Sequence, residues 1–486
     1  VVLADIPPMG SRDTPPLEPV PSSPNITPPS SPPPPPPPQP APDTFVIPSF
    51  GKPPPPPPQT SAFQVASSPP PPSNGGYQLP PIPTVNPWPK RIMVLGILAL
   101  IIIGVFFGVK TFFSSMSGGG NAATPEVTGK NQQDVTVVYW GLWEDEAVIR
   151  PVIQAFQNTH PHITIQYVAN TVRDYRQRVM TQLRSGTGPD VFRFHNTWVA
   201  MLQNDLSPVP STVMTSDEFS STFYPVASTD LVAGTTIYGI PLMFDGLGLY
   251  YNQELFTAAG VATPPTTWEE IVNAGGLVDK LTAKDGTKIR TSAIALGTTN
   301  NIENFSDIIA TMMYQNGANL VSPTGSEAEQ TLQFYRKFAT PGDPLYTWDE
   351  TMDNAIYAFA TGRVAMILAP SWRAFSIKEI NPNIQFGIAP FPQLSGVPVS
   401  WASYWVEGVS SQSKNKAAAW EFVKYLTSKE GATLLYSSAQ QSRQLFGEPY
   451  ARRDMGDSIK SDPYVGAFVT MAANAKSFPL ASRTFD

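Results

Sequence analysis

Aromatic, carboxylate and amide side chains recur just after segments whose apolar pattern predicts β-strands. These residues are Trp143, Glu144, His195, Asn196, Asp245 and Trp372, and Asn304, Trp401 and Tyr404 are further candidates of the same residue types. Open α/β sheets bind ligands in the crevice beyond the carboxyl ends of their strands, so residues at such positions can meet at one site. Aromatic faces stack on the apolar face of a ring, and carboxylates and amides bind hydroxyl groups. The set therefore predicts recognition of a ring that carries many hydroxyls.

Several of the polar residues also have a purely structural interpretation. Glu144 precedes two further acids, and acidic side chains favour the first turn of a helix whatever else they bind. Asn196 is a suitable helix cap. Asp245 lies between two apolar segments, where a charge is costly unless it is paired or hydrated, but an aspartate before a glycine is also common in turns. On sequence alone both interpretations stay open for each residue.

The aromatic-rich run SWASYW, residues 400–405, raises the same question. If it forms one strand, Trp401 and Trp405 share a face and Tyr404 lies on the other. Some of these rings must then pack in the core. We favour Trp401 and Tyr404 as ligand-facing residues.

The elements that must position these residues follow one another in α/β order. Strands are expected at 135–140, 163–168, after the turn 186–192, and at 237–242, 247–251 and 364–368. Helices are expected at 144–158, 174–185 and 253–259. Gly260 is placed to end the third of these helices, and Thr266 or Thr267 to cap the next. Strands separated by helices predict an α/β fold with parallel sheet. The region after residue 133, about 350 residues, suits two lobes better than one.

The first 89 residues differ in composition from the rest of the chain. They hold 34 of the 55 prolines and few large apolar residues, which predicts a disordered tail with polyproline II character. Such a tail is a solvated spacer or, alternatively, a docking segment for aromatic-lined grooves.

Residues 92–109 contain no charged side chain and, at the helical rise, cover about 27 Å. A cleaved signal peptide fits poorly, because so much chain precedes the run. Lys90 and Arg91 before it, against Lys110 after it, place the N-terminus inside. We therefore expect a cytoplasmic tail at 1–89, a single-pass membrane helix (signal anchor) at 90–113, a flexible linker at 114–133 and an extracytoplasmic two-lobed domain at 134–486.

Composition argues against several function classes. The net charge is −7 and no basic stripe is present, so no nucleic-acid partner is expected. The absence of cysteine removes disulfides, thiol catalysis and cysteine metal sites. No nucleophile elbow, phosphate loop or metal-ligand spacing occurs. We therefore expect no catalytic set, no metal and no cofactor.

Four segments carry a resemblance to a known family. They are TIYGIPLMFDGLGLYYNQELFTAAGVATPPTTWEEI (Thr236–Ile271), SGTGPDVFRFHNTW (Ser185–Trp198), FATGRVAMILAPSW (Phe359–Trp372) and AAAWEFVKYLTSKEG (Ala417–Gly431). Their order and spacing resemble the bacterial extracellular solute-binding proteins of the maltose-binding type, from about Val135 to the end of the chain. Members usually continue for one or more helices past the position of Asp486.

The resemblance implies a two-lobed, type II periplasmic-binding-protein-like fold with a hinge. Each lobe would hold a mixed five-stranded sheet with helices on both faces. A sugar would bind in the cleft, with Asp245 at the hinge and Trp372 as the surface under the sugar ring. Arg483 lies where the family's last cleft loop comes. The expected partners are a carbohydrate and the permease subunits of an ABC-type importer, with the chain itself a monomer anchored in the cell membrane.

Two other functions remain open from the sequence. A sensory or adhesion receptor could use the same sugar-binding fold and signal through the tail. A carbohydrate-active enzyme needs two carboxylates across one bond, and Glu144 and Asp245 could meet in a cleft. Binding without chemistry explains the richness in aromatic residues better, so we expect a binding protein rather than an enzyme.

Overall fold

The computed structural model describes residues 133–394, 396 and 398–478. All of them belong to one compact unit, Ala123–Asp486. The expected tail, membrane helix and almost the whole linker lie outside the described residues, and so does Arg483. Within the part of the chain that is described, no helix is both long enough and apolar enough to cross a membrane.

The first lobe is built on a six-stranded mixed sheet. Its strands are β1 (Val135–Leu142), β2 (Ile163–Asn170), β3 (Val191–His195), β4 (Leu206–Ser207), β7 (Ile240–Pro241) and β14 (Trp405–Ser410). The order is β2-β1-β3-β14-β4, and β7 also pairs with β14. Strands β1, β2 and β3 are parallel, whereas β14 runs antiparallel to β3. The expectation of five strands in this lobe was wrong, because the short strands β4 and β7 both pair with β14.

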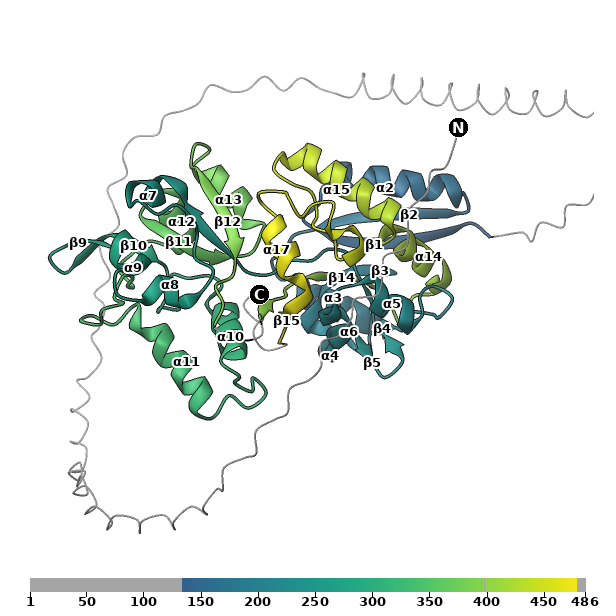
Figure 1. Ribbon diagram of the computed structural model, residues 1–486. Helices are drawn as coiled ribbons and strands as arrows, with labels where there is room; N and C mark the ends of the chain where they lie inside the picture. The colour runs from purple at the N-terminus through teal and green to yellow at the C-terminus, as the bar shows by residue number, and fades with distance from the viewer. Residues whose placement is uncertain (1–132, 395, 397, 479–486) are drawn as a thin grey trace, which may run out of the picture. The chain divides into compact units, whose positions relative to one another are not determined.

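Helices cover both faces of this sheet (Figure 1). They are α2 (Glu146–Thr159), α3 (Tyr175–Ser185), α4 (Val199–Leu202), α5 (Ser216–Thr222), α6 (Pro225–Leu231), α14 (Lys416–Leu426) and α15 (Lys429–Arg443), with a 3₁₀ turn η1 (Asn196–Trp198) and a hairpin of β5 (Val232–Ala233) and β6 (Thr236–Ile237). In α2 the buried residues Val148, Val152 and Phe156 recur at helical spacing, which confirms the expected amphipathic helix.

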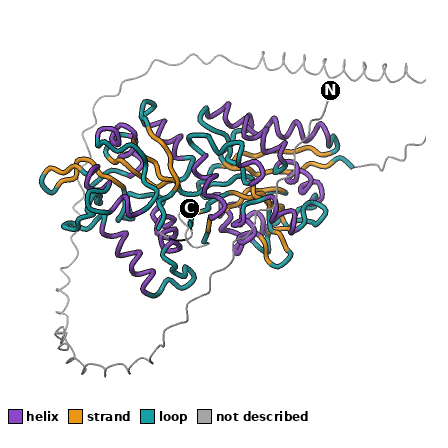
Figure 2. The backbone as a smooth tube through the Cα atoms, in the orientation of Figure 1, coloured by secondary structure: helices purple, strands orange, loops and turns teal. Residues whose placement is uncertain are grey.

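The second lobe is built on a five-stranded mixed sheet, as expected. Its strands are β8 (Gly248–Asn252), β9 (Ala283–Asp285), β10 (Lys288–Ile294), β11 (Val364–Ala369) and β12 (Phe386–Pro390), in the order β12-β8-β11-β10-β9. Only β10 and β11 pair in parallel. Its helices are α7 (Gln253–Ala258), α8 (Trp268–Val272), α9 (Leu277–Leu281), α10 (Phe305–Gln315), α11 (Ser326–Lys337), α12 (Ala355–Ala360) and α13 (Arg373–Ile380). Figure 2 shows helices and strands interleaved in both lobes.

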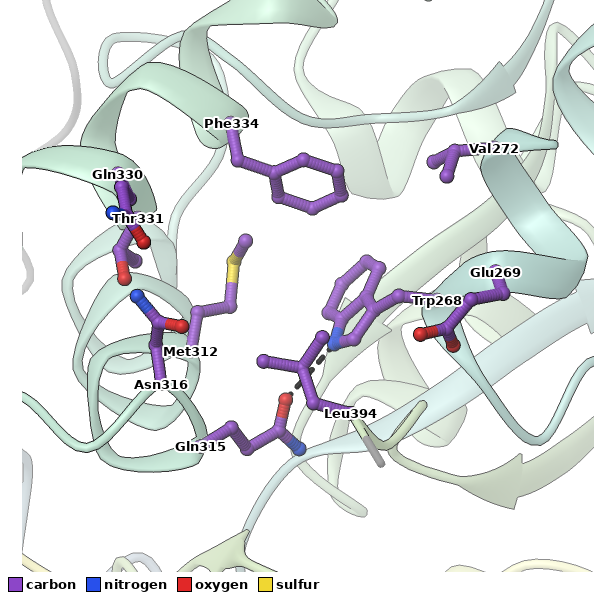
Figure 3. A pocket seen from close by; sticks show the side chains of 10 residues that line it. All are labelled: Trp268, Glu269, Val272, Met312, Gln315, Asn316, Gln330, Thr331, Phe334 and Leu394. Atoms are coloured by element: carbon purple, nitrogen blue, oxygen red, sulfur yellow. Dashed lines mark hydrogen bonds between the residues drawn. The ribbon is translucent and has the colours of Figure 1, made fainter. Parts of the chain in front are cut away.

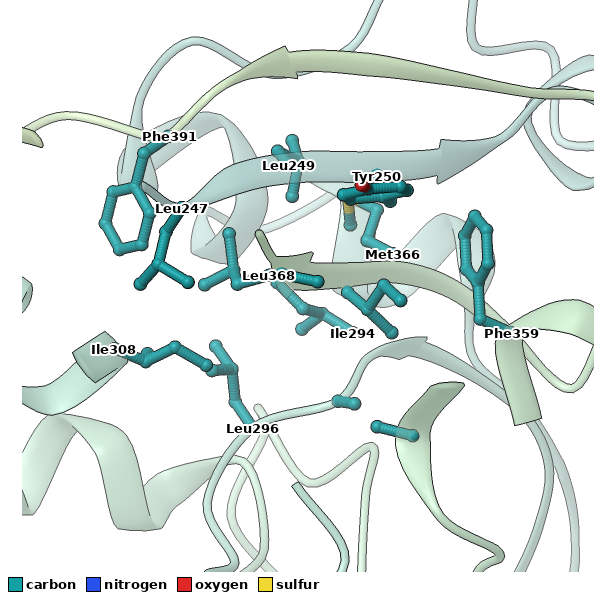
Figure 4. Close-up of a cluster of buried hydrophobic side chains, with 14 of the residues drawn as sticks. Leu247, Leu249, Tyr250, Ile294, Leu296, Ile308, Phe359, Met366, Leu368 and Phe391 are labelled. Atoms are coloured by element: carbon teal, nitrogen blue, oxygen red, sulfur yellow. The ribbon is translucent and has the colours of Figure 1, made fainter. Parts of the chain in front are cut away.

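Each lobe has its own apolar core. In the second lobe, side chains from β8, β10 and β11 meet those of the flanking helices, as Figure 4 shows for Tyr250, Ile294, Met366 and Phe359. The local signals for this region were accurate. Thr267 caps α8 in a capping box with Glu270, and Gly260 has φ 68° just after α7.

The chain passes between the lobes more than once, and the crossing segments are bonded to one another. The Ser403 N–H donates to the Asp245 carbonyl (3.0 Å), and the Phe244 N–H donates to the Pro449 carbonyl (3.0 Å). The remaining elements follow this junction or lie within it. They are β13 (Ser400–Trp401), α16 (Arg453–Gly456), α17 (Gly466–Met471), η2 (Ala472–Asn474) and β15 (Ala475–Lys476), which pairs with β13.

Two expected strands are broken in the structure. The expected strand 237–242 is divided between β6, which ends at Ile237, and β7 (Ile240–Pro241), with Tyr238 and Gly239 between them. The strand breaks because β6 turns back to pair with β5, whereas β7 pairs with β14. Residues 400–405 are not one strand either. The Ala402 N–H donates to the Lys476 carbonyl, so the backbone leaves β13 before β14 begins. The alternation of faces assumed for SWASYW therefore does not hold.

Candidate functional site

Trp143 and Glu144 follow β1 at the carboxyl edge of the first sheet, as predicted. Trp143 has a left-handed backbone (φ 51°) and its side chain is 36% exposed. Glu144 is buried, and its Oε2 accepts a 2.6 Å hydrogen bond from Arg193 Nη1. The two neighbours thus point to different environments, the indole toward solvent and the carboxylate into the lobe.

Arg193, in the middle of β3, holds two carboxylates together. Its Nε donates to Glu407 Oε1 (2.7 Å), and its Nη2 donates to the Tyr139 hydroxyl (3.0 Å). All of these side chains are buried, and one oxygen of each glutamate, Glu144 Oε1 and Glu407 Oε2, has no partner. Burial raises the pKa of Glu144 to about 7 against the opposing effect of Arg193. Removing Arg193 would leave two buried carboxylates without a positive partner, which is costly.

His195 and Asn196, at the end of β3, are both buried and bonded within the protein. His195 Nε2 lies 3.0 Å from Ser403 Oγ, and burial lowers the pKa of its imidazole to about 3, so the ring is neutral near pH 7. Asn196 donates to Asp230 Oδ2 (2.9 Å) and accepts from the Tyr404 N–H (3.1 Å). The structure therefore gives both side chains a role in joining β3 to the junction segments.

Trp401 and Tyr404, the predicted pair from SWASYW, are also fully buried. The Tyr404 hydroxyl donates to Asp230 Oδ2 (2.7 Å), and Trp401 packs in the core of the second lobe. The half-buried ring in this run is instead Trp405, whose centroid is 5.0 Å from that of Trp143 in an edge-on contact. The break in the strand at Ala402 explains why the expected alternation of faces does not describe the burial of these rings.

Asp245 is half-buried at the point where the chain enters the second lobe. Its Oδ1 accepts from the Gly246 N–H (2.8 Å) and the Ser371 N–H (3.0 Å), and its Oδ2 accepts from Ser371 Oγ (2.9 Å). Burial raises the pKa of this carboxyl to about 7, although the hydrogen bonds act in the opposite direction. Asp245 thus fixes the loop that precedes Trp372.

Trp372 follows β11 in the second lobe and is 38% exposed. The guanidinium of Arg373 lies over its ring, with Cζ 3.9 Å from the ring centroid, and Arg373 forms an ion pair with Glu303. Asn304 is buried before α10 and hydrogen-bonds the Asp307 carboxyl, whose pKa burial raises to about 7. Among the predicted residues, only Trp143 and Trp372 present large exposed rings.

Sequence reasoning did not single out Arg193, Asp230 or Arg373. A signal existed for Arg193, because a charged residue inside the apolar strand VFRFH requires a buried partner. Glu407 in the apolar strand WVEGVS gives the complementary signal. In the part of the chain that the structure covers, no group of three or more acidic, histidine or cysteine side chains is placed to hold a metal ion.

Two cavities in the second lobe lie apart from the predicted residues. One, of about 250 Å³, is lined by Trp268, Met312 and Phe334 among others, and Figure 3 shows these side chains facing one another. The other, of about 750 Å³, lies near Lys284 and Tyr346. Neither is lined by a residue that the sequence predicted to bind ligand, so we keep the site at the strand ends.

Two α/β lobes joined by bonded crossing segments, with exposed indoles on loops that follow strands, define a periplasmic-binding-protein-like architecture. The sequence profile described as "Bacterial extracellular solute-binding protein" matches residues 140–433, more than half of the chain. The chain belongs to this family.

Relatives and solved structures agree with this assignment. The multiple sugar-binding protein of Streptococcus mutans is 22% identical over 364 residues, which cover 72% of this chain and 81% of that protein. A cyclo/maltodextrin-binding protein solved with maltotetraose has a TM-score of 0.58 at 18% identity, covering 73% of this chain and 88% of its own. The sugar-binding protein MalE of Xanthomonas citri also has a TM-score of 0.58, at 21% identity, with 71% and 87% covered. At these identities the structural likeness shows the fold.

Proposed function

We propose that this chain is the carbohydrate-binding subunit of an ABC-type importer, with a mono- or oligosaccharide as its ligand and no catalytic activity of its own. The observation that carries the proposal is the pair of exposed indoles, Trp143 and Trp372, one on each lobe and each on a loop after a strand. An indole presents a large apolar face, which suits the CH-rich face of a sugar ring. The names of the Streptococcus mutans relative and of the cyclo/maltodextrin-binding protein, which are sugar-binding proteins, support the same choice.

The charges around the two indoles favour a neutral sugar. Arg193 is neutralised by Glu144 and Glu407, and Arg373 is paired with Glu303. An anionic ligand such as a sugar phosphate would meet no uncompensated cation among these residues and would be repelled by Asp245 when that carboxyl is ionised. We therefore favour neutral glycans over glycerol phosphate and related anions.

Calorimetric titration of the purified chain tests the proposal directly. The panel contains maltotriose, maltotetraose, mannobiose and D-tagatose, with glycerol 3-phosphate and glutamate as chemically different controls. We expect saturable binding of at least one neutral sugar and none of either anion. Binding of an anion alone, or of no member of the panel, would contradict the proposal for these sugars.

The proposal includes a membrane anchor at residues 90–113, which would take the place of a lipid anchor. The anchor would keep the binding domain close to the permease subunits, and the linker at 114–133 would give it reach. By random-coil scaling a linker of this length spans roughly 25 Å. Pull-down of the chain with permease subunits in the presence and absence of sugar would test this partnership.

A further inference from the structure

The two exposed tryptophans share an unusual neighbour. In the first lobe, Arg193 Cζ lies 5.3 Å from the ring centroid of Trp143. In the second lobe, Arg373 Cζ lies 3.9 Å from the ring centroid of Trp372. Both distances fall within the range in which a guanidinium is attracted to an aromatic face. The same arrangement thus occurs twice, on lobes that have separate cores.

The guanidinium lies on the protein side of the ring in both cases. Arg193 is 1% exposed, whereas Trp143 is 36% exposed. The Arg373 side chain is 17% exposed and its Nε is buried, whereas Trp372 is 38% exposed. A largely buried cation against a half-exposed ring means that the ring separates the cation from solvent. Each indole is therefore contacted by a guanidinium from within the lobe, and part of its surface remains exposed. Trp143 also contacts Trp405 edge-on.

Each guanidinium is fixed by carboxylates from other elements. Arg193 is bound by Glu144, after β1, and by Glu407, on β14. Arg373 is bound by Glu303, which lies in the loop before α10. The rings are consequently tied to several elements of their lobes, although each ring lies on a short loop.

We propose that Arg193 and Arg373 are positioning residues for sugar binding, each of which holds one indole as a rigid stacking surface. The inference rests on the proposed function. A ring that is already immobilised loses little freedom when a sugar stacks on it, and pre-organisation of this kind strengthens binding. Neither arginine needs to contact the sugar, because its inner position leaves the contact to the indole.

The inference predicts that the effect of Arg373 depends on Trp372. Maltotriose is titrated into the wild type, Arg373→Met, Trp372→Ala and the double variant. We expect Arg373→Met to weaken binding three- to tenfold in the wild-type background and by less than 1.5-fold in the Trp372→Ala background. Such non-additivity identifies a residue that acts through its neighbour. An equal loss in both backgrounds, or no loss in the wild-type background, would overturn the inference.

Arg363→Met is the matched control. Arg363 is also on the second lobe and also forms an ion pair, with Asp353, but it is not among the arginines found over an aromatic ring. It should leave maltotriose affinity unchanged in either background. Arg373→Lys is a second variant, which keeps the charge without the planar face, and we expect it to recover only part of the affinity.

A ligand-free measurement separates failure of the inference from failure of the proposed function. The chain is labelled with 5-fluorotryptophan, and the Trp372 fluorine resonance is assigned from Trp372→Phe. We expect Arg373→Met to shift this resonance and narrow it, because the ring gains motion, whereas Arg363→Met leaves it in place. An unchanged resonance would overturn the inference even if maltotriose binds. Absence of maltotriose binding to the wild type would instead count against the proposed function for that sugar.

The first lobe gives an independent repeat of the spectroscopic test. Arg193 compensates two buried carboxylates, so a neutral replacement endangers the fold. Arg193→Lys keeps the charge and removes the planar face, and it should shift the Trp143 resonance without moving that of Trp372. If this variant does not fold, Glu407→Gln can be used instead, because it removes one of the two ion pairs of Arg193. It should shift the Trp143 resonance in the same direction. No shift in a folded variant would refute the assignment for this lobe.

Discussion

At the residue scale, the half-buried Asp245 accepts several hydrogen bonds from within the protein. Its carboxylate accepts three hydrogen bonds, of which two come from Ser371 and one from Gly246. These bonds favour ionisation, yet burial dominates and raises the pKa to about 7. A carboxyl whose folded-state pKa lies above its unfolded value stabilises the fold only while it is protonated. Its contribution is complete below about pH 4 and is lost as the pH rises through 7.

Asp245→Asn should therefore flatten part of the pH dependence of stability. The amide cannot ionise, so the melting temperature of the variant should fall less between pH 5 and pH 8 than that of the wild type. Sugar affinity should fall about five- to thirtyfold, because hydrogen bonds to a charged group contribute roughly 1.5–3 kcal/mol against about 1 for neutral ones. Melting curves and titrations across pH, with the exposed Asp217→Asn as control, check both effects. An unchanged affinity together with a lowered melting temperature would assign Asp245 to architecture alone.

Trp372 provides the second prediction at this scale. Its ring is half-exposed, so truncation removes little from the core. Trp372→Ala should weaken binding of the preferred sugar at least tenfold, about 1.4 kcal/mol, while the melting temperature without sugar changes little. Trp401→Ala is the contrasting variant, because that indole is 1% exposed and its loss should reduce stability first. Equal affinities for Trp372→Ala and wild type would move the stacking surface elsewhere.

At the element scale, helix α8 depends on its cap. Thr267 Oγ1 accepts from the Glu270 N–H, and Glu270 Oε2 accepts from the Thr266 N–H (2.6 Å) and the Thr267 N–H. Thr267→Ala should lower the free energy of unfolding by about 1 kcal/mol. Sugar affinity should not change, since α8 lies outside the predicted site. Denaturant titration measures the loss, and Thr267→Ser, which keeps the hydroxyl, should restore most of it.

Where the chain crosses between the lobes, the backbone at Gly246 packs directly against the backbone at Trp401. A Cβ added at Gly246 would lie 2.2 Å from the Trp401 carbonyl oxygen, so one segment would have to move. Gly246→Ala should cost about 1–3 kcal/mol of stability, as overpacking does elsewhere. Gly260→Ala meets open space and should cost only the strain of its left-handed backbone. Denaturant titration measures the free energy of unfolding of both variants. Equal losses of stability would mean that the crossing segments can move apart to accommodate the added methyl group.

The elements also show where sequence reasoning stops. Helices α2 and α3 and the unit from β8 to the cap of α8 were predictable, because their periodicity, caps and turn glycine are local signals. The path of residues 400–405 was not, because Ala402 and Ser403 bond to Lys476 and Asp245, which are remote in sequence. For the same reason the sequence could not tell which rings of this run are buried: Trp401 and Tyr404 are buried, whereas Trp405 is half-buried. The ligand-binding residues remain a prediction.

At the scale of the whole molecule, the first lobe is notable for a buried cluster of charges. The first lobe encloses Glu144 and Glu407 around one guanidinium, so it carries an excess of negative charge when both carboxylates ionise. Burial raises the pKa of both groups, which relieves that excess as the pH falls. Two-lobed organisation was predictable from chain length and α/β order. In the sequence, this charge pattern was visible only as Arg193 and Glu407, two isolated charges in apolar strands.

The last prediction concerns how the whole chain is placed in the cell. Residues 92–109 are free of charge, and the basic residues Lys90 and Arg91 precede them, so we expect one membrane span at about 92–113 with the N-terminal tail inside. Family membership supports a binding domain outside the cytoplasm, which agrees with that orientation. Protease added to intact cells, with any outer barrier opened, should digest the domain after residue 133 and spare the proline-rich tail. Exchanging the flanking charges, with Lys90→Glu and Arg91→Glu, should reduce the fraction of correctly oriented chains, because positive residues are retained on the cytoplasmic side. Protection of the domain in wild-type cells would reject the anchor topology and leave the sugar-binding assignment to be judged by the titrations alone.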